Sequence, residues 1–188
     1  MIELLQRANR GLPAVRAWVE AQLAAHASRA VPIAGLGFER LPRCFSAAVL
    51  SETRSVTVAR IPLPPLSAFG FPELASIETM GVSGVTFKNV CFVHASVRSE
   101  SIHFHEVVHA VQWRALGVDQ FMLTYAMGLL QHGYAHSPLE AMAYDLQSQF
   151  DRGLAITDAE AQICEQALVL RDLTADLFRR HGLVMGQS

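Results

Sequence analysis

The spacing of hydrophobic positions changes several times in the first half of the chain, which predicts a series of short, different elements. Between positions 13 and 29, apolar residues recur at helical spacing, and Pro13 stands where a first helical turn accepts proline. Two runs with strand-like composition follow, at 45–50 and 55–61. The run 85–93 is the richest in β-branched and aromatic residues and predicts the clearest strand. A loop is expected at 62–72, which holds four prolines.

The second half of the chain has a helical pattern throughout. Ser99 or Ser101 is placed to cap a helix that ends at Gly117. Further helices are expected at 120–131, 139–151 and 158–181. This order indicates the α+β class, with a small antiparallel sheet packed against the first of these helices and a mainly helical C-terminal half. The length of 188 residues fits a single domain spanning 1–188.

Composition and charge narrow the classes of function. The chain is 51% hydrophobic, yet it has no run near the ~20 apolar residues that a membrane-spanning helix needs. Its net charge of −2 and scattered basic residues argue against a nucleic-acid partner. The start lacks the features of a secretory signal, and the three widely spaced cysteines favour a reducing compartment, so we expect a cytoplasmic protein. The apolar composition is compatible with a dimer surface but does not require one.

One short motif carries metal chemistry. His105 and His109 frame an HExxH sequence on a predicted helix, where positions i and i+4 share one face. Both imidazoles can therefore reach one zinc ion, and a catalytic zinc site leaves a coordination position for water. Glu106 follows the first histidine and can act as general base on that water without binding the metal.

The third ligand is sought on a later helix. The metzincin arrangement would need glycine at 112 and histidine at 115, where this chain has Gln112 and Ala115, so that class is excluded. The motif helix continues for ~14 Å beyond the histidines, and an antiparallel helix would return over ~18 Å. The next helix should then begin level with the histidines, which favours Glu140 in its first turn. His132 and His136 precede it and remain alternatives that would give an all-histidine site.

These residues resemble a known class of enzyme. The segment HEVVHAVQW, a glycine after the helix and a P-x-E-x-x-A segment are similar to the gluzincin zinc metallopeptidases, especially the small single-domain ones. The resemblance covers roughly 85–150 and implies a minimal zincin-like domain, a zinc ion on His105, His109 and Glu140, Glu106 as base, and a peptide or protein substrate. Large gluzincins of the thermolysin kind carry an aspartate four residues after the third ligand. This chain has Tyr144 there, with Asp145 next, so a carboxylate that supports a ligand histidine is not carried over.

Other polar residues near the motif have several possible roles. The candidates for stabilising a developing oxyanion are Tyr134, Tyr144 and His136. Gln112 lies one turn beyond His109, placed to bond a ligand or a buried carbonyl group. His103 is on another helix face and is expected to be exposed. The apolar spacing of 121–129, which includes Tyr125, predicts core packing.

The sequence thus predicts a zinc-dependent hydrolase, a metallopeptidase in which Glu106 activates a zinc-bound water. One alternative is a zinc-binding regulatory or partner-binding domain without catalysis, derived from a peptidase. The other is a metal-free helical interaction domain in which the motif is incidental.

Overall fold

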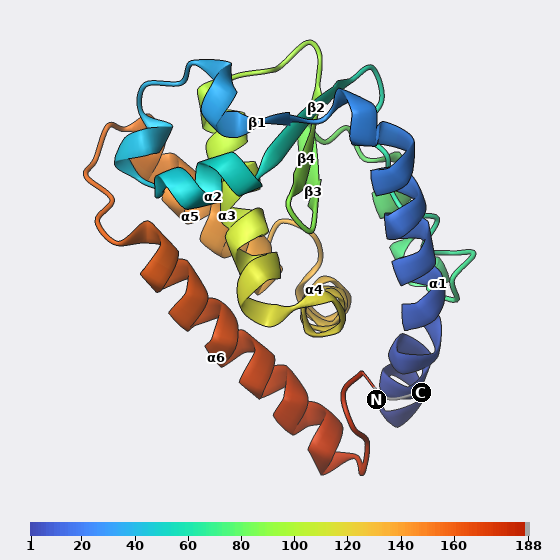
Figure 1. The fold of residues 1–188 in the computed structure, drawn as a ribbon. Coiled ribbons are helices and arrows are strands. Elements are labelled where there is room, and N and C mark those ends of the chain that lie inside the picture. Colours follow the sequence, from blue (N-terminus) through green and yellow to red (C-terminus); the bar gives the residue numbers. More distant parts are fainter. Residues whose placement is uncertain (187–188) are drawn as a thin grey trace.

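The computed structural model describes residues 1–186 and confirms the α+β class (Figure 1). Its helices are α1 (Ile2–His26), α2 (Ala47–Glu52), α3 (Glu100–Leu116), α4 (Val118–His132), α5 (Pro138–Asp151) and α6 (Ala159–Arg180). Its strands are β1 (Val31–Pro32), β2 (Arg54–Val58), β3 (Gly84–Phe87) and β4 (Val90–His94). Short 3-10 helices occur at Ala27–Arg29, Ile33–Leu36, Leu41–Arg43 and Pro72–Thr79.

The four strands form one sheet in the order β1-β2-β4-β3. The β1–β2 and β3–β4 pairs are antiparallel, but β2 and β4 are parallel, so the sheet is mixed and the expectation of an antiparallel sheet was wrong in this respect. A parallel pair needs a long crossover, and residues 59–83 provide it. The run 85–93 is a hairpin and not one strand, because the chain turns at Lys88, whose φ is 55°.

Two further elements differ from the sequence prediction. Helix α1 begins at Ile2 and passes through Pro13, because the buried side chains of Leu5, Ala8 and Leu12 continue its apolar face upstream. The run at 45–50 lies largely in helix α2, where Ser46 Oγ accepts a hydrogen bond from the Val49 N–H.

Helix α3 is the central element and has most of its residues buried. Ser99 caps its start by accepting the Ile102 N–H at 3.2 Å, and Gly117 ends it with a φ of 73°. It contacts β3 and β4 on one side and α4, α5 and α6 on the others. Helix α1 packs against α4, and the segment that follows α6 reaches α1, where Asn9 donates to the Val184 carbonyl oxygen. No helix within residues 1–186 combines the length and the apolar composition needed to cross a membrane.

Candidate metal centre

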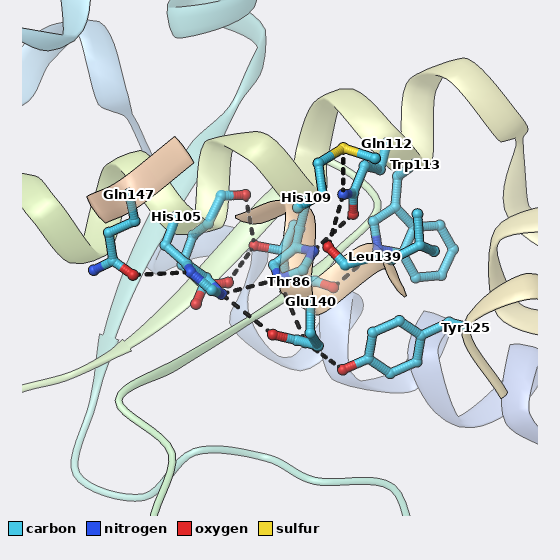
Figure 2. Close-up of polar contacts among 11 residues, drawn as sticks. Thr86, His105, His109, Gln112, Trp113, Tyr125, Leu139, Glu140 and Gln147 are labelled. Carbon is cyan, nitrogen blue, oxygen red and sulfur yellow. Dashed lines mark hydrogen bonds and ion pairs between the residues drawn. The ribbon is translucent and has the colours of Figure 1, made fainter. Parts of the chain in front are cut away.

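Three potential ligands from two helices meet in the interior (Figure 2). His105 and His109 lie one turn apart on α3, and their Nε2 atoms are 3.1 Å apart. Glu140, in the first turn of α5, places Oε2 3.4 Å from His105 Nε2 and Oε1 3.4 Å from His109 Nε2. The first turn of α5 thus lies beside the two histidines of α3, as predicted. Glu140, the residue favoured from the sequence, is therefore the third member of the group.

The spacing of these atoms fits a metal ion. Two ligands about 2.1 Å from a tetrahedral zinc ion lie about 3.4 Å apart, close to the separations found here. Oε2 of Glu140 is buried and has no hydrogen-bond partner within residues 1–186. A buried carboxylate oxygen in that condition is costly unless a cation is bound beside it. The group of His105, His109 and Glu140 could thus hold a metal ion.

Two glutamines set the proton positions of the histidines. Gln147 Oε1 lies 3.0 Å from His105 Nδ1, and Gln112 Oε1 lies 2.8 Å from His109 Nδ1. An amide oxygen can only accept, so both Nδ1 atoms carry a proton, and the Nε2 atoms are the ones that can bind a metal. Without a metal, a proton on His109 Nε2 can bond His105 Nε2 across the 3.1 Å between them, and a cation bound there would replace this proton. The tautomers therefore suit a metal bound at the Nε2 atoms.

The other end of each amide has a hydrogen-bond partner of its own. The Gln112 amide nitrogen donates to the Leu139 carbonyl oxygen at 3.0 Å, and that of Gln147 donates to Ser101 Oγ at 2.9 Å. Gln112 thus performs both roles considered for it, because it bonds a candidate ligand and also satisfies a buried carbonyl group. Gln147 bonds His105 from the same helix that carries Glu140.

The electrostatics of the group favour positive charge. Burial favours the neutral form of His109, but the nearby Glu140 carboxylate outweighs burial and raises the pKa of His109 to about 9. Burial likewise opposes ionisation of Glu140, yet His109 and His105 hold its pKa well below its usual range. A buried anion beside two imidazoles is the charge pattern that a divalent cation would complete.

Tyr125 is a site residue that sequence reasoning assigned to the core. Its ring does stack on Phe121, with centroids 5.6 Å apart, but its hydroxyl donates to Oε1 of Glu140. The bond orients the carboxylate from the side of α4. The sequence did contain a clue to this role, since Tyr125 places a hydroxyl group in the middle of an otherwise apolar helix face. A buried hydroxyl group needs a polar partner.

Glu106 lies against strand β3. Thr86 Oγ1 is 2.7 Å from Glu106 Oε2 and 3.0 Å from the Glu106 carbonyl oxygen, so its proton can bond either. The side chain is only 3% exposed, and burial raises the pKa of Glu106 although His105 and His109 act in the opposite direction. Within residues 1–186, Glu106 is outside the set of ligand atoms that could share one ion.

Comparison with protein-family models, curated proteins and solved structures finds no match to this chain. The resemblance to gluzincins therefore rests on the HExxH segment, the glycine after its helix and the P-x-E-x-x-A segment that contains Glu140.

The remaining histidines lie elsewhere. His132 and His136 are exposed and outside the ligand group found within residues 1–186. His103 is fully buried, which corrects the expectation of an exposed side chain. Its Nε2 lies 2.9 Å from Ser55 Oγ and its Nδ1 2.7 Å from the Ser99 carbonyl oxygen, so it links α3 to strand β2. Tyr144 is partly exposed, with its ring 4.7 Å from that of His105.

Proposed function

We propose that this protein is a zinc-dependent hydrolase of amide bonds, most simply a peptidase, with zinc held by His105, His109 and Glu140. The observation that carries the proposal is the pair of Nε2 atoms that face each other and Glu140, each histidine fixed by a glutamine. This donor set, two imidazoles and one carboxylate, is typical of catalytic zinc sites, which keep a position for water.

Zinc at this position would act as a Lewis acid and lower the pKa of its water toward ~7. Glu106 would accept a proton on its carboxylate and return it to the departing amine, while Thr86 holds Oε2. Burial raises the pKa of this carboxyl group, which makes its anion a stronger base. The choice of peptide bonds comes from the resemblance to gluzincins.

A zinc-binding domain without catalysis is the second candidate. It is favoured by the low exposure of the site, where His105, Glu106, His109 and Glu140 are 3–6% exposed. A structural zinc site is closed to solvent in this way, whereas a catalytic site must admit substrate. The two candidates differ in what they require of Glu106, since only catalysis needs a base there.

Metal content tests the ligands. We expect about one zinc per chain by elemental analysis of wild-type protein and loss of zinc in His109→Ala and in Glu140→Ala. His136→Ala changes an exposed histidine in the turn before α5 and should keep the metal. Absence of metal from wild-type protein supplied with zinc would contradict the proposal.

Turnover of a mixed peptide library tests the base. Glu106→Gln keeps the size of the side chain and should retain zinc while losing at least ~10²-fold in turnover. Unchanged turnover in this variant would disprove the role of Glu106. A wild-type protein that binds zinc and cleaves nothing would support the non-catalytic domain.

A further inference from the structure

A cavity of about 140 Å³ adjoins the candidate metal centre. His105, Glu106, His109 and Glu140 line it, and two further polar lining residues, Thr86 and Tyr125, are bonded to Glu106 and to Glu140, so these polar groups gather at one end. The rest of its lining is almost entirely apolar and comes mainly from α1, from the crossover after β2, from β3 and from α4; examples are Leu12, Val15, Leu63, Phe71, Met122 and Leu129. The cavity is therefore polar at one end only, which is the form of a site for a ligand with one polar and one apolar part.

The volume limits the apolar part. An engineered protein cavity of ~150 Å³ lined by aliphatic and aromatic side chains stays dry and binds benzene. The cavity here matches that size, so it accommodates about one aromatic ring or a branched alkyl group of similar size. A long unbranched acyl chain exceeds it.

The charges of the lining limit the ligand further. Among residues 1–186, no lysine or arginine lines the cavity, so its apolar end has no counter-ion for a carboxylate or a phosphate. A neutral apolar part of the ligand is favoured at this end. The polar part of the ligand would lie at the other end, beside His105, His109 and Glu140.

The walls are held in place without a ligand. Leu5, Leu12 and Val19 anchor α1 by burial. Ion pairs then join α1 to three other parts of the fold: Arg7 to Glu73, Arg16 to Asp119, and Glu20 to Lys88. Each exposed pair contributes little free energy by itself, but together they fix α1 at three places. A preformed cavity binds without the cost of ordering its walls.

We infer that the site takes a small substrate that carries a compact apolar group about the size of a phenyl ring. This group is attached to the carbonyl carbon whose C–N bond is cleaved. This inference rests on the proposed function for the reaction, whereas the binding preference follows from the cavity alone.

Three hydroxamates with the same metal-binding group test the preference by calorimetry on the zinc-loaded protein. Benzohydroxamate should bind about tenfold to hundredfold more tightly than acetohydroxamate, because its ring is buried. Decanohydroxamate should bind no more tightly than benzohydroxamate. Equal affinity for the first two would overturn the inference, as would an affinity that keeps rising with chain length.

Filling the cavity supplies a matched pair of variants. Ala126 is half-buried on α4 and lines the cavity, so Ala126→Phe should abolish the preference for benzohydroxamate while acetohydroxamate still binds. Ala175→Phe makes the same change at a half-buried position on α6 outside the cavity lining and should keep the preference. A preference that persists in Ala126→Phe would place the ring elsewhere.

Metal-free protein separates this inference from the proposed function. Toluene should raise the melting temperature of metal-free wild type and of Ala175→Phe, but not of Ala126→Phe. If toluene stabilises the protein and zinc does not bind, the cavity inference stands and the hydrolase proposal fails. The opposite result is that zinc binds, toluene does not change the melting temperature and the hydroxamates bind equally. In that case the cavity inference fails and the hydrolase proposal stands.

Discussion

Gly84 on β3 faces the carboxylate of Glu106 so closely that a Cβ atom on Gly84 would lie 2.4 Å from Glu106 Oε1. The absence of a side chain at Gly84 lets the carboxylate rest against the strand, and Thr86, two residues further on, bonds its other oxygen. The position of the proposed base therefore depends on the composition of strand β3 as well as on the HExxH motif.

Gly84→Ala should displace Glu106 and lower turnover by about 10² while zinc content stays at the wild-type level. The clashing atom is the end of a flexible side chain, so the carboxylate moves and the fold survives. The measurements are kcat/KM and elemental analysis. Gly81→Ala is the control, since a Cβ at that exposed glycine has nothing within 4 Å. Equal losses of turnover in Gly84→Ala and Gly81→Ala would show that the change acts on the segment around the start of β3 and not through Glu106.

Gln147→Ala should weaken zinc binding by about tenfold to a hundredfold, because His105 loses the acceptor that fixes its tautomer. The measurement is competition with a chelating dye. The metal-free protein should lose only about 1 kcal/mol of stability, since one half-buried hydrogen-bonding side chain is removed. Gln149→Ala, two positions further along α5, should leave zinc affinity unchanged, and a loss of affinity there as large as in Gln147→Ala would count against the assignment.

Tyr125→Phe should weaken zinc binding by about tenfold, because Glu140 loses the hydroxyl donor that orients Oε1. The ring and its stacking on Phe121 are retained, so the effect should appear in zinc affinity and not in the helix content measured by circular dichroism. Zinc affinity equal to that of wild type would mean that the carboxylate is held by the helix alone.

Cys91 should resist thiol reagents in the native protein between pH 7 and 9. Burial raises the pKa of its thiol, and the nearby Glu106 carboxylate raises it further, so the reactive thiolate is scarce and enclosed. Burial also raises the pKa of Cys44 and Cys164, but these are partly exposed and should label faster as the pH increases. Peptide mass spectrometry after timed labelling reads each site. Rapid labelling of Cys91 without denaturant would contradict its burial.

The sequence predicted the elements whose signals are local and strong. The capped start of α3, its end at Gly117 and the start of α5 at Pro138 follow from single residues with defined conformational preferences. Glu140 was favoured as a carboxylate in the first turn of a later helix, and the structure brings it beside the two histidines. The strand prediction for 45–50 was wrong because a short apolar run does not distinguish helix from strand. Ser46, which caps helix α2, was the residue that could have indicated the helix.

The supporting residues were harder to predict. Tyr125 shares the apolar spacing of its neighbours, and only the approach of α5 shows that its hydroxyl meets Glu140. Gln147 did carry a signal, because it lies seven positions after Glu140 and therefore two turns along the same helix face. The parallel pairing of β2 and β4 depends on where a long crossover returns, and no local pattern encodes that.

The two ends of the cavity have separate origins in the chain. The ligand group and its supporting glutamines come from α3 and α5, whereas α1 and the crossover after β2 supply much of the apolar wall. Substitutions in α1 and in the crossover after β2 can therefore reshape what is accepted without disturbing the groups that would do the chemistry. A family built on this fold would be free to diversify its substrates while its reaction stayed constant.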